Sequence, residues 1–132
     1  MMTKTKKAYI PSKIELEGLL SITKEDSIQR WAMLHFSYFA GLRSMEIASL
    51  SIEDIFQGNE LKGMAQLPTK GGGTRRITLV DKKLRSAIST FYEVQNLSAK
   101  PMTAPLFTNP SGGRFTPNAV VKQFVKMYQK AN

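Results

Sequence analysis

Residues 41–55 read GLRSMEIASLSIEDI, and this stretch organises the rest of the chain. Gly41 follows a long apolar segment, and glycine is the residue that most often ends a helix. Ser44 is expected to cap a new, short helix. Arg43 therefore stands between a helix end and a helix start, where unpaired backbone N–H groups attract anions. Its planar guanidinium can hold two phosphate oxygens at once.

The residues before Gly41 predict two helices. Ser12-Lys13-Ile14-Glu15 is a capping box and opens the first helix. The second is expected to begin near Asp26 and to run to Phe39. Apolar residues cover most of its surface, which predicts a central place in the core.

The residues after Gly41 predict strands and then two more helices. Strands are expected at 55–56, from Leu61 onward and at 75–80, with a glycine-rich tip at 71–73. Asp81 and Thr116 are then placed to cap amphipathic helices. We predict an α+β fold that is mainly helical, with a small three-stranded antiparallel sheet.

Composition limits the function classes. The 132 residues include no cysteine and one histidine, which excludes disulfides and multi-histidine metal sites. No apolar run is long enough to cross a membrane. The net charge is +9, and residues 61–132 hold 12 basic and 2 acidic groups. A basic half favours nucleic acid as a partner, although a merely solubilising surface would have the same composition.

A second segment, PTKGGGTRRITL at residues 68–79, joins glycines to basic residues. Taken alone it could be a solvated hairpin tip. It does not fit the phosphate-binding P-loop, which requires Gly-x-x-x-x-Gly-Lys-Ser/Thr.

Together the Gly-Leu-Arg-x-x-Glu box and the lysine hairpin resemble the tyrosine recombinases, the phage integrase family. The resemblance covers roughly residues 9–130. It implies that Arg43 binds the scissile phosphate, that Glu46 supports the site structurally, and that Lys70 is the general acid for the departing 5′-oxygen. It also implies no metal and no cofactor. The expected contacts to the DNA backbone are Lys62, Thr74, Arg75 and Arg76.

The family's later boxes do not occur in these 132 residues. His-x-x-Arg and the nucleophilic tyrosine should follow, but the one histidine, His35, has Tyr38 three places on. We expect His35 to be a packing or hydrogen-bonded residue, and Tyr128 to be a helix-face residue rather than a nucleophile. We therefore interpret residues 10–132 as part of a recombinase catalytic domain, after a flexible basic arm at 1–9.

The expected function is site-specific DNA recombination in the parent protein, by strand cleavage and rejoining. This chain is expected to bind DNA but to be catalytically incomplete. Two alternatives are a non-catalytic DNA-binding or regulatory module and a type IB topoisomerase relative. Double-stranded DNA is the expected partner, without membrane or small-molecule substrate. The expected location is cytoplasmic, for a prokaryotic or phage protein, in association with the nucleoid. Self-association is also expected, through apolar surface left uncovered near Trp31 and Phe39.

Overall fold

The computed structural model describes residues 12–69 and 71–131. The basic arm predicted at 1–9 and the candidate general acid Lys70 lie outside the described residues.

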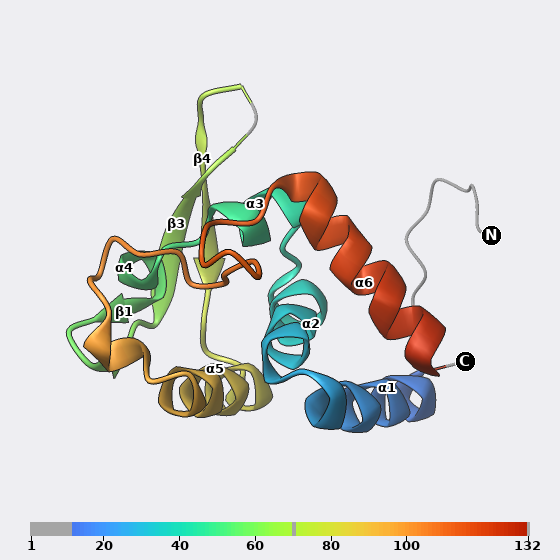
Figure 1. The fold of residues 1–132 in the computed structure, drawn as a ribbon. Coiled ribbons are helices and arrows are strands. Elements are labelled where there is room, and N and C mark those ends of the chain that lie inside the picture. The colour runs from blue at the N-terminus through green and yellow to red at the C-terminus, as the bar shows by residue number, and fades with distance from the viewer. Residues whose placement is uncertain (1–11, 70, 132) are drawn as a thin grey trace.

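The described residues form a mainly helical domain with short antiparallel strands (Figure 1). The helices are α1 (Lys13–Asp26), α2 (Ile28–Ala40), α3 (Ser44–Ser49), α4 (Ile52–Ile55), α5 (Lys82–Val94), the 3₁₀ turn η1 (Leu97–Ala99) and α6 (Pro117–Ala131). The strands are β1 (Phe56–Gln57), β2 (Glu60–Leu61), β3 (Met64–Pro68) and β4 (Thr74–Thr78). The predicted α+β class is confirmed.

Helix α2 is the centre of the core. Six consecutive residues, 31–36, are buried, so the helix is covered on nearly every side. It packs on α1, α3, α5 and α6, which surround it in Figure 1. Trp31 is buried, at 8% exposure, and Phe39 is half-buried. The apolar surface expected near them is therefore largely covered by these neighbours.

The strands differ in detail from the predicted three-stranded sheet. They form two antiparallel pairs, β1 with β2 and β3 with β4. The segment predicted as one middle strand bends at Gly63, and this bend separates β2 from β3. The backbone N–H of Leu79 donates to the Gly63 carbonyl at 2.9 Å, so the longer hairpin continues to the bend.

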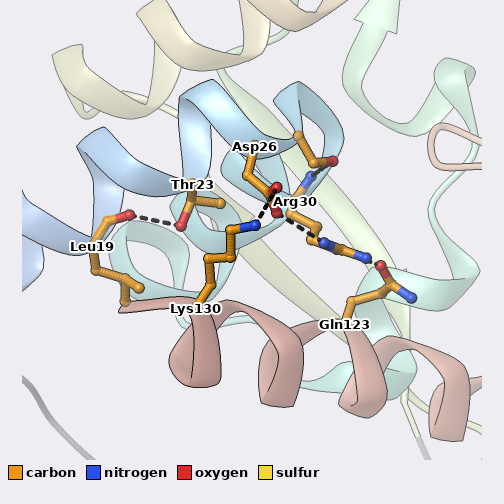
Figure 2. A network of polar contacts seen from close by, with 7 residues as sticks. Leu19, Thr23, Asp26, Arg30, Gln123 and Lys130 are labelled. Atoms are coloured by element: carbon orange, nitrogen blue, oxygen red, sulfur yellow. Dashed lines mark hydrogen bonds and ion pairs between the residues drawn. The ribbon is translucent and has the colours of Figure 1, made fainter. Parts of the chain in front are cut away.

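Helix α6 returns along the side of the molecule and contacts α3 at one end and α1 at the other (Figure 1). Figure 2 shows a polar network that joins α6, at Gln123 and Lys130, to α1 and α2. Asp26 contacts Arg30 at 3.1 Å and Lys130 at 3.4 Å, and the Arg30 Nε donates to Gln123 at 2.7 Å. Over the residues that the structure covers, no helix is both long and apolar enough to span a membrane.

Candidate phosphate-binding site

The site is built on the sharp turn between α2 and α3. Gly41 ends α2 with φ of 68°, a left-handed conformation that glycine adopts without strain. Leu42 is buried and anchors the turn in the core. Arg43 follows as the N-cap of α3 and is exposed. The predicted cap was Ser44, one residue later.

Glu46 explains why the helix starts at this point. Its carboxylate accepts the backbone N–H of Arg43 at 2.9 Å, which satisfies a donor that the first turn would otherwise leave free. Helix α3 has only six residues, and this carboxylate already occupies its positive end. The helix terminus is therefore not an open anion site, and an anion would depend on the Arg43 side chain. In the part of the chain that the structure describes, the Arg43 guanidinium has no hydrogen bond or ion pair.

The partner of Glu46 is Arg75, which reaches it from β4. The Arg75 Nε donates to Glu46 Oε2 at 2.9 Å, and Nη2 donates to Oε1 at 3.1 Å. The same Nη2 also donates to the Gly41 carbonyl at 2.8 Å. The Glu46 side chain is 1% exposed, so this is a covered ion pair. Its hydrogen bonds with Arg75, and then that with the Arg43 N–H, lower the pKa of Glu46 although burial opposes them.

Three residues of β4, Thr74, Arg75 and Arg76, are predicted to contact phosphate, but they do not lie on one face of the strand. Side chains alternate along a strand. Arg75 lies on the side of β4 that also carries the buried Ile77, whereas Thr74 and Arg76 lie on the opposite side and are exposed. Thr74 and Arg76 are thus accessible to a ligand, while the Arg75 fork is already bonded inside the protein.

The hairpin tip has the tight geometry that its glycines predict. The Thr69 N–H donates to the Gly73 carbonyl at 2.9 Å, and Gly71 and Gly72 have φ of 96° and 92°. Lys70, the predicted general acid, lies outside the described residues, between Thr69 and Gly71 in the sequence. Arg75 pairs with Leu67 across the ladder, three residues before Lys70. The Arg75 contacts therefore fix the hairpin next to the Arg43 turn.

Lys62 lies at the other end of the hairpin. It follows β2, is half-buried, and lines an open hollow together with Glu53 and Asp54. At about 3.3 Å per residue, the length of β3 separates it from the tip. These carboxylates give the surroundings of Lys62 a more acidic character than those of Arg43.

The two remaining candidate side chains, His35 and Tyr128, are packed within the fold. His35 is 4% exposed, and its Nδ1–H donates to the Trp31 carbonyl at 2.8 Å, so the prediction that it is a packed, hydrogen-bonded residue is confirmed. Tyr128 is half-buried on α6, and burial raises the pKa of its hydroxyl. No cluster of three or more histidine or acidic residues able to hold a metal ion occurs among the described residues.

One supporting residue was not predicted. Arg114 donates to the carbonyls of Ala48 and Leu50, at 3.2 and 2.9 Å, and to Ser51 Oγ at 2.8 Å. These contacts cap the C-terminal end of α3, where a cation is favourable. The local sequence gives no signal for them because Arg114 lies more than sixty residues away along the chain.

The fold and this turn can be compared with known proteins. The model of the phage integrase family matches residues 12–132. The chain therefore belongs to this family, the tyrosine recombinases. Among curated relatives, it is 35% identical over 89 residues to tyrosine recombinase XerC of Pseudomonas fluorescens, a match that covers 67% of this chain and 28% of that protein. It is 28% identical over 121 residues to XerC of Actinobacillus succinogenes, which covers 87% of this chain and 39% of that protein.

Solved structures agree on the fold. The XerA recombinase crystal structure superposes with a TM-score of 0.76 at 18% identity, over 98% of this chain and 45% of that chain. The DNA-bound lambda integrase structure gives 0.66 at 12% identity, over 97% and 46%. The chain thus spans less than half the length of these relatives.

Proposed function

We propose that this chain is the part of a tyrosine recombinase catalytic domain that binds duplex DNA and presents Arg43 and Lys70 to the phosphate where a strand is cut. The observation that carries the proposal is the exposed Arg43 guanidinium, which has no ion pair within the described residues, on a turn fixed by Glu46 and Arg75. The fold match to lambda integrase bound to DNA, and to its dimer on a core site, supports duplex DNA as partner and self-association as a property.

The chemistry follows from the family. A tyrosine would attack the phosphodiester and form a 3′-phosphotyrosyl link. Arg43 would stabilise the negative charge that develops on the phosphate oxygens, and Lys70 would give a proton to the departing 5′-oxygen. Thr74 and Arg76 would hold the neighbouring DNA backbone.

Residues 1–132 contain no His-x-x-Arg box or nucleophile box. We therefore propose that this polypeptide alone binds DNA without cutting it, in the cytoplasm of a prokaryotic cell.

A binding-only regulatory module would use the same surface, and the half-buried position of Tyr128 favours binding over cleavage for this stretch. Membership of the phage integrase family favours a recombinase over a type IB topoisomerase relative.

The test is a titration of a labelled duplex with the 132-residue chain, followed by fluorescence anisotropy. Binding should be weak and should fall more than about tenfold between roughly 50 and 200 mM salt, because phosphate contacts release counterions. Arg43→Gln should weaken binding by about tenfold, the effect of one charge-assisted contact.

Lys82→Gln is the matched control. It removes the same charge from an exposed residue at the start of α5, the end of the molecule opposite the hairpin tip (Figure 1). Equal losses in the two variants would mean that net charge alone drives binding, and would refute the proposed role of Arg43.

A further inference from the structure

We propose that Arg75 is a positioning residue that keeps Arg43 available for phosphate, by occupying the Glu46 carboxylate with which Arg43 would otherwise pair. The inference rests on the proposed function, because the ligand of Arg43 is taken to be a DNA phosphate. It assigns Arg75 a role other than the direct phosphate contact expected from its place in the hairpin.

The first step is the competition for Glu46. A glutamate three residues after an arginine on a helix is well placed for an ion pair with it. Arg43 and Glu46 have this spacing, and the charge of Arg43 is close enough to help lower the Glu46 pKa. Nevertheless the carboxylate bonds to the guanidinium of Arg75, and only the backbone N–H of Arg43 reaches it.

The second step is geometric. Both Glu46 oxygens accept from the Arg75 fork, and Oε1 also accepts the Arg43 N–H. A covered carboxylate with a bidentate partner has little tendency to exchange it for a single exposed side chain. The Arg75 bond to the Gly41 carbonyl adds a third contact at the other end of the turn. Arg75 thus bonds the backbone before Arg43, at Gly41, and the Glu46 side chain after it, while the Arg43 side chain is exposed.

The third step separates Arg75 from its neighbour. Arg76 has the same charge, lies one position on, and is exposed on the opposite side of β4. It has no ion pair in the described part of the chain. Removing Arg76 removes a surface charge and its own proposed backbone contact but leaves the Arg43 turn intact, whereas removing Arg75 leaves the Glu46 carboxylate to capture Arg43.

The test measures duplex affinity for the full 132-residue chain in a set of glutamine variants. In the wild-type background and in Arg76→Gln, adding Arg43→Gln should weaken binding by about tenfold. In Arg75→Gln the same addition should weaken it less than about threefold, because Arg43 is already engaged by Glu46. Arg75→Lys keeps the charge but not the bidentate guanidinium. In this background, adding Arg43→Gln should weaken binding by an amount between about threefold and about tenfold.

The decisive variant is Glu46→Gln in the Arg75→Gln background. Removal of the competing carboxylate should free Arg43, so that adding Arg43→Gln again weakens binding by about tenfold. This is expected even though the contacts of Arg75 with the turn are still missing. If Arg75 were merely structural, this second substitution would restore nothing. If Arg75 touched phosphate directly, Arg75→Gln and Arg43→Gln would be additive. Either outcome overturns the proposal.

Two further measurements distinguish a failure of the positioning role of Arg75 from a failure of the proposed DNA-binding function. Thermal unfolding confirms that each variant is folded at the assay temperature. The amide resonance of Arg43, without DNA, should shift in Arg75→Gln but not in Arg76→Gln, since its bonding partner is Glu46. If Arg43→Gln fails to change affinity in any background, the proposed function fails, while this resonance still decides whether Arg75 sets the turn. An unchanged resonance in Arg75→Gln overturns the positioning role.

Discussion

At the residue scale, His35 illustrates how burial controls a titratable group. Its ring lies between Trp31 and Phe39, with ring centroids 4.7 and 5.4 Å away. Burial lowers its pKa, and Lys24 and Lys83 act in the same direction. The bond to the Trp31 carbonyl and the charge of Asp81 oppose the shift. The neutral ring is therefore the form that the folded protein favours.

This shift predicts a loss of stability in mild acid. The unfolded chain takes up a proton at His35 near pH 6.5, whereas the folded chain does so only at a lower pH. The free energy of unfolding should be constant above about pH 7 and should fall as the pH drops below about 6.5, by at most about 1.4 kcal/mol per pH unit. Urea unfolding at several pH values between about 7.5 and about 5 measures this fall in the free energy of unfolding. His35→Gln should flatten the slope, and equal slopes in both proteins would contradict the assignment.

Residue-scale predictions from sequence succeed where the interaction is local. The Ser12–Glu15 capping box, the left-handed Gly41 and the Asp81 cap are all present. Each involves groups within four residues, so the sequence contains both partners. The Arg75–Glu46 pair joins residues 29 positions apart. Its formation depends on strand register and on the packing of the hairpin against α3, which no local pattern encodes.

At the element scale, the two-stranded hairpin differs from the predicted sheet for a similar reason. Alternating burial along β3 and β4 is visible in the sequence, and their pairing is antiparallel as predicted. The bend at Gly63 cannot be predicted from the sequence, because a glycine within an extended segment is compatible with either a continuous strand or a break. The consequence for the site is that Lys62 belongs to the β2–β3 junction and not to the hairpin ladder.

The attachment of α6 gives the element-scale prediction. Asp26 makes ion pairs with Arg30 and Lys130, from α2 and α6 (Figure 2). Lys130 is largely exposed, so its pair with Asp26 is screened, whereas the Arg30 pair is only partly exposed. Asp26→Asn should cost about 1 kcal/mol or less. This corresponds to a fall in Tm of at most about 4 °C. Glu25→Gln, a neighbouring exposed carboxylate, should change Tm little. Calorimetry at low salt and at about 1 M salt should show the difference shrinking. A difference that persists at high salt would rule out an ion-pair origin.

At the scale of the whole molecule, net charge and composition favour nucleic acid as a partner class but do not predict which face would bind it. The fold brings an exposed arginine turn and the outward side of β4 to the same end of the molecule, as the Arg75 contacts require. Exposed apolar side chains include Val121 and Val125 on α6, away from the expected surface, and Tyr38, next to Phe39 on α2. The apolar surface of α2 correctly predicts its central place in the core, but not which helices cover Trp31 and Phe39.

The last prediction concerns covalent chemistry by the 132-residue polypeptide. Incubation with a nicked duplex that traps tyrosyl intermediates should give no protein–DNA adduct on a denaturing gel. The roles proposed for Arg43 and Lys70, charge stabilisation and proton donation, do not include the nucleophile that the ester requires. Tyr128 is a poor substitute, because it is half-buried on α6 and burial raises the pKa of its hydroxyl. A full-length XerC on its own nicked site is the positive control. An adduct formed by this chain and lost in Tyr128→Phe would make Tyr128 the nucleophile and overturn its structural assignment.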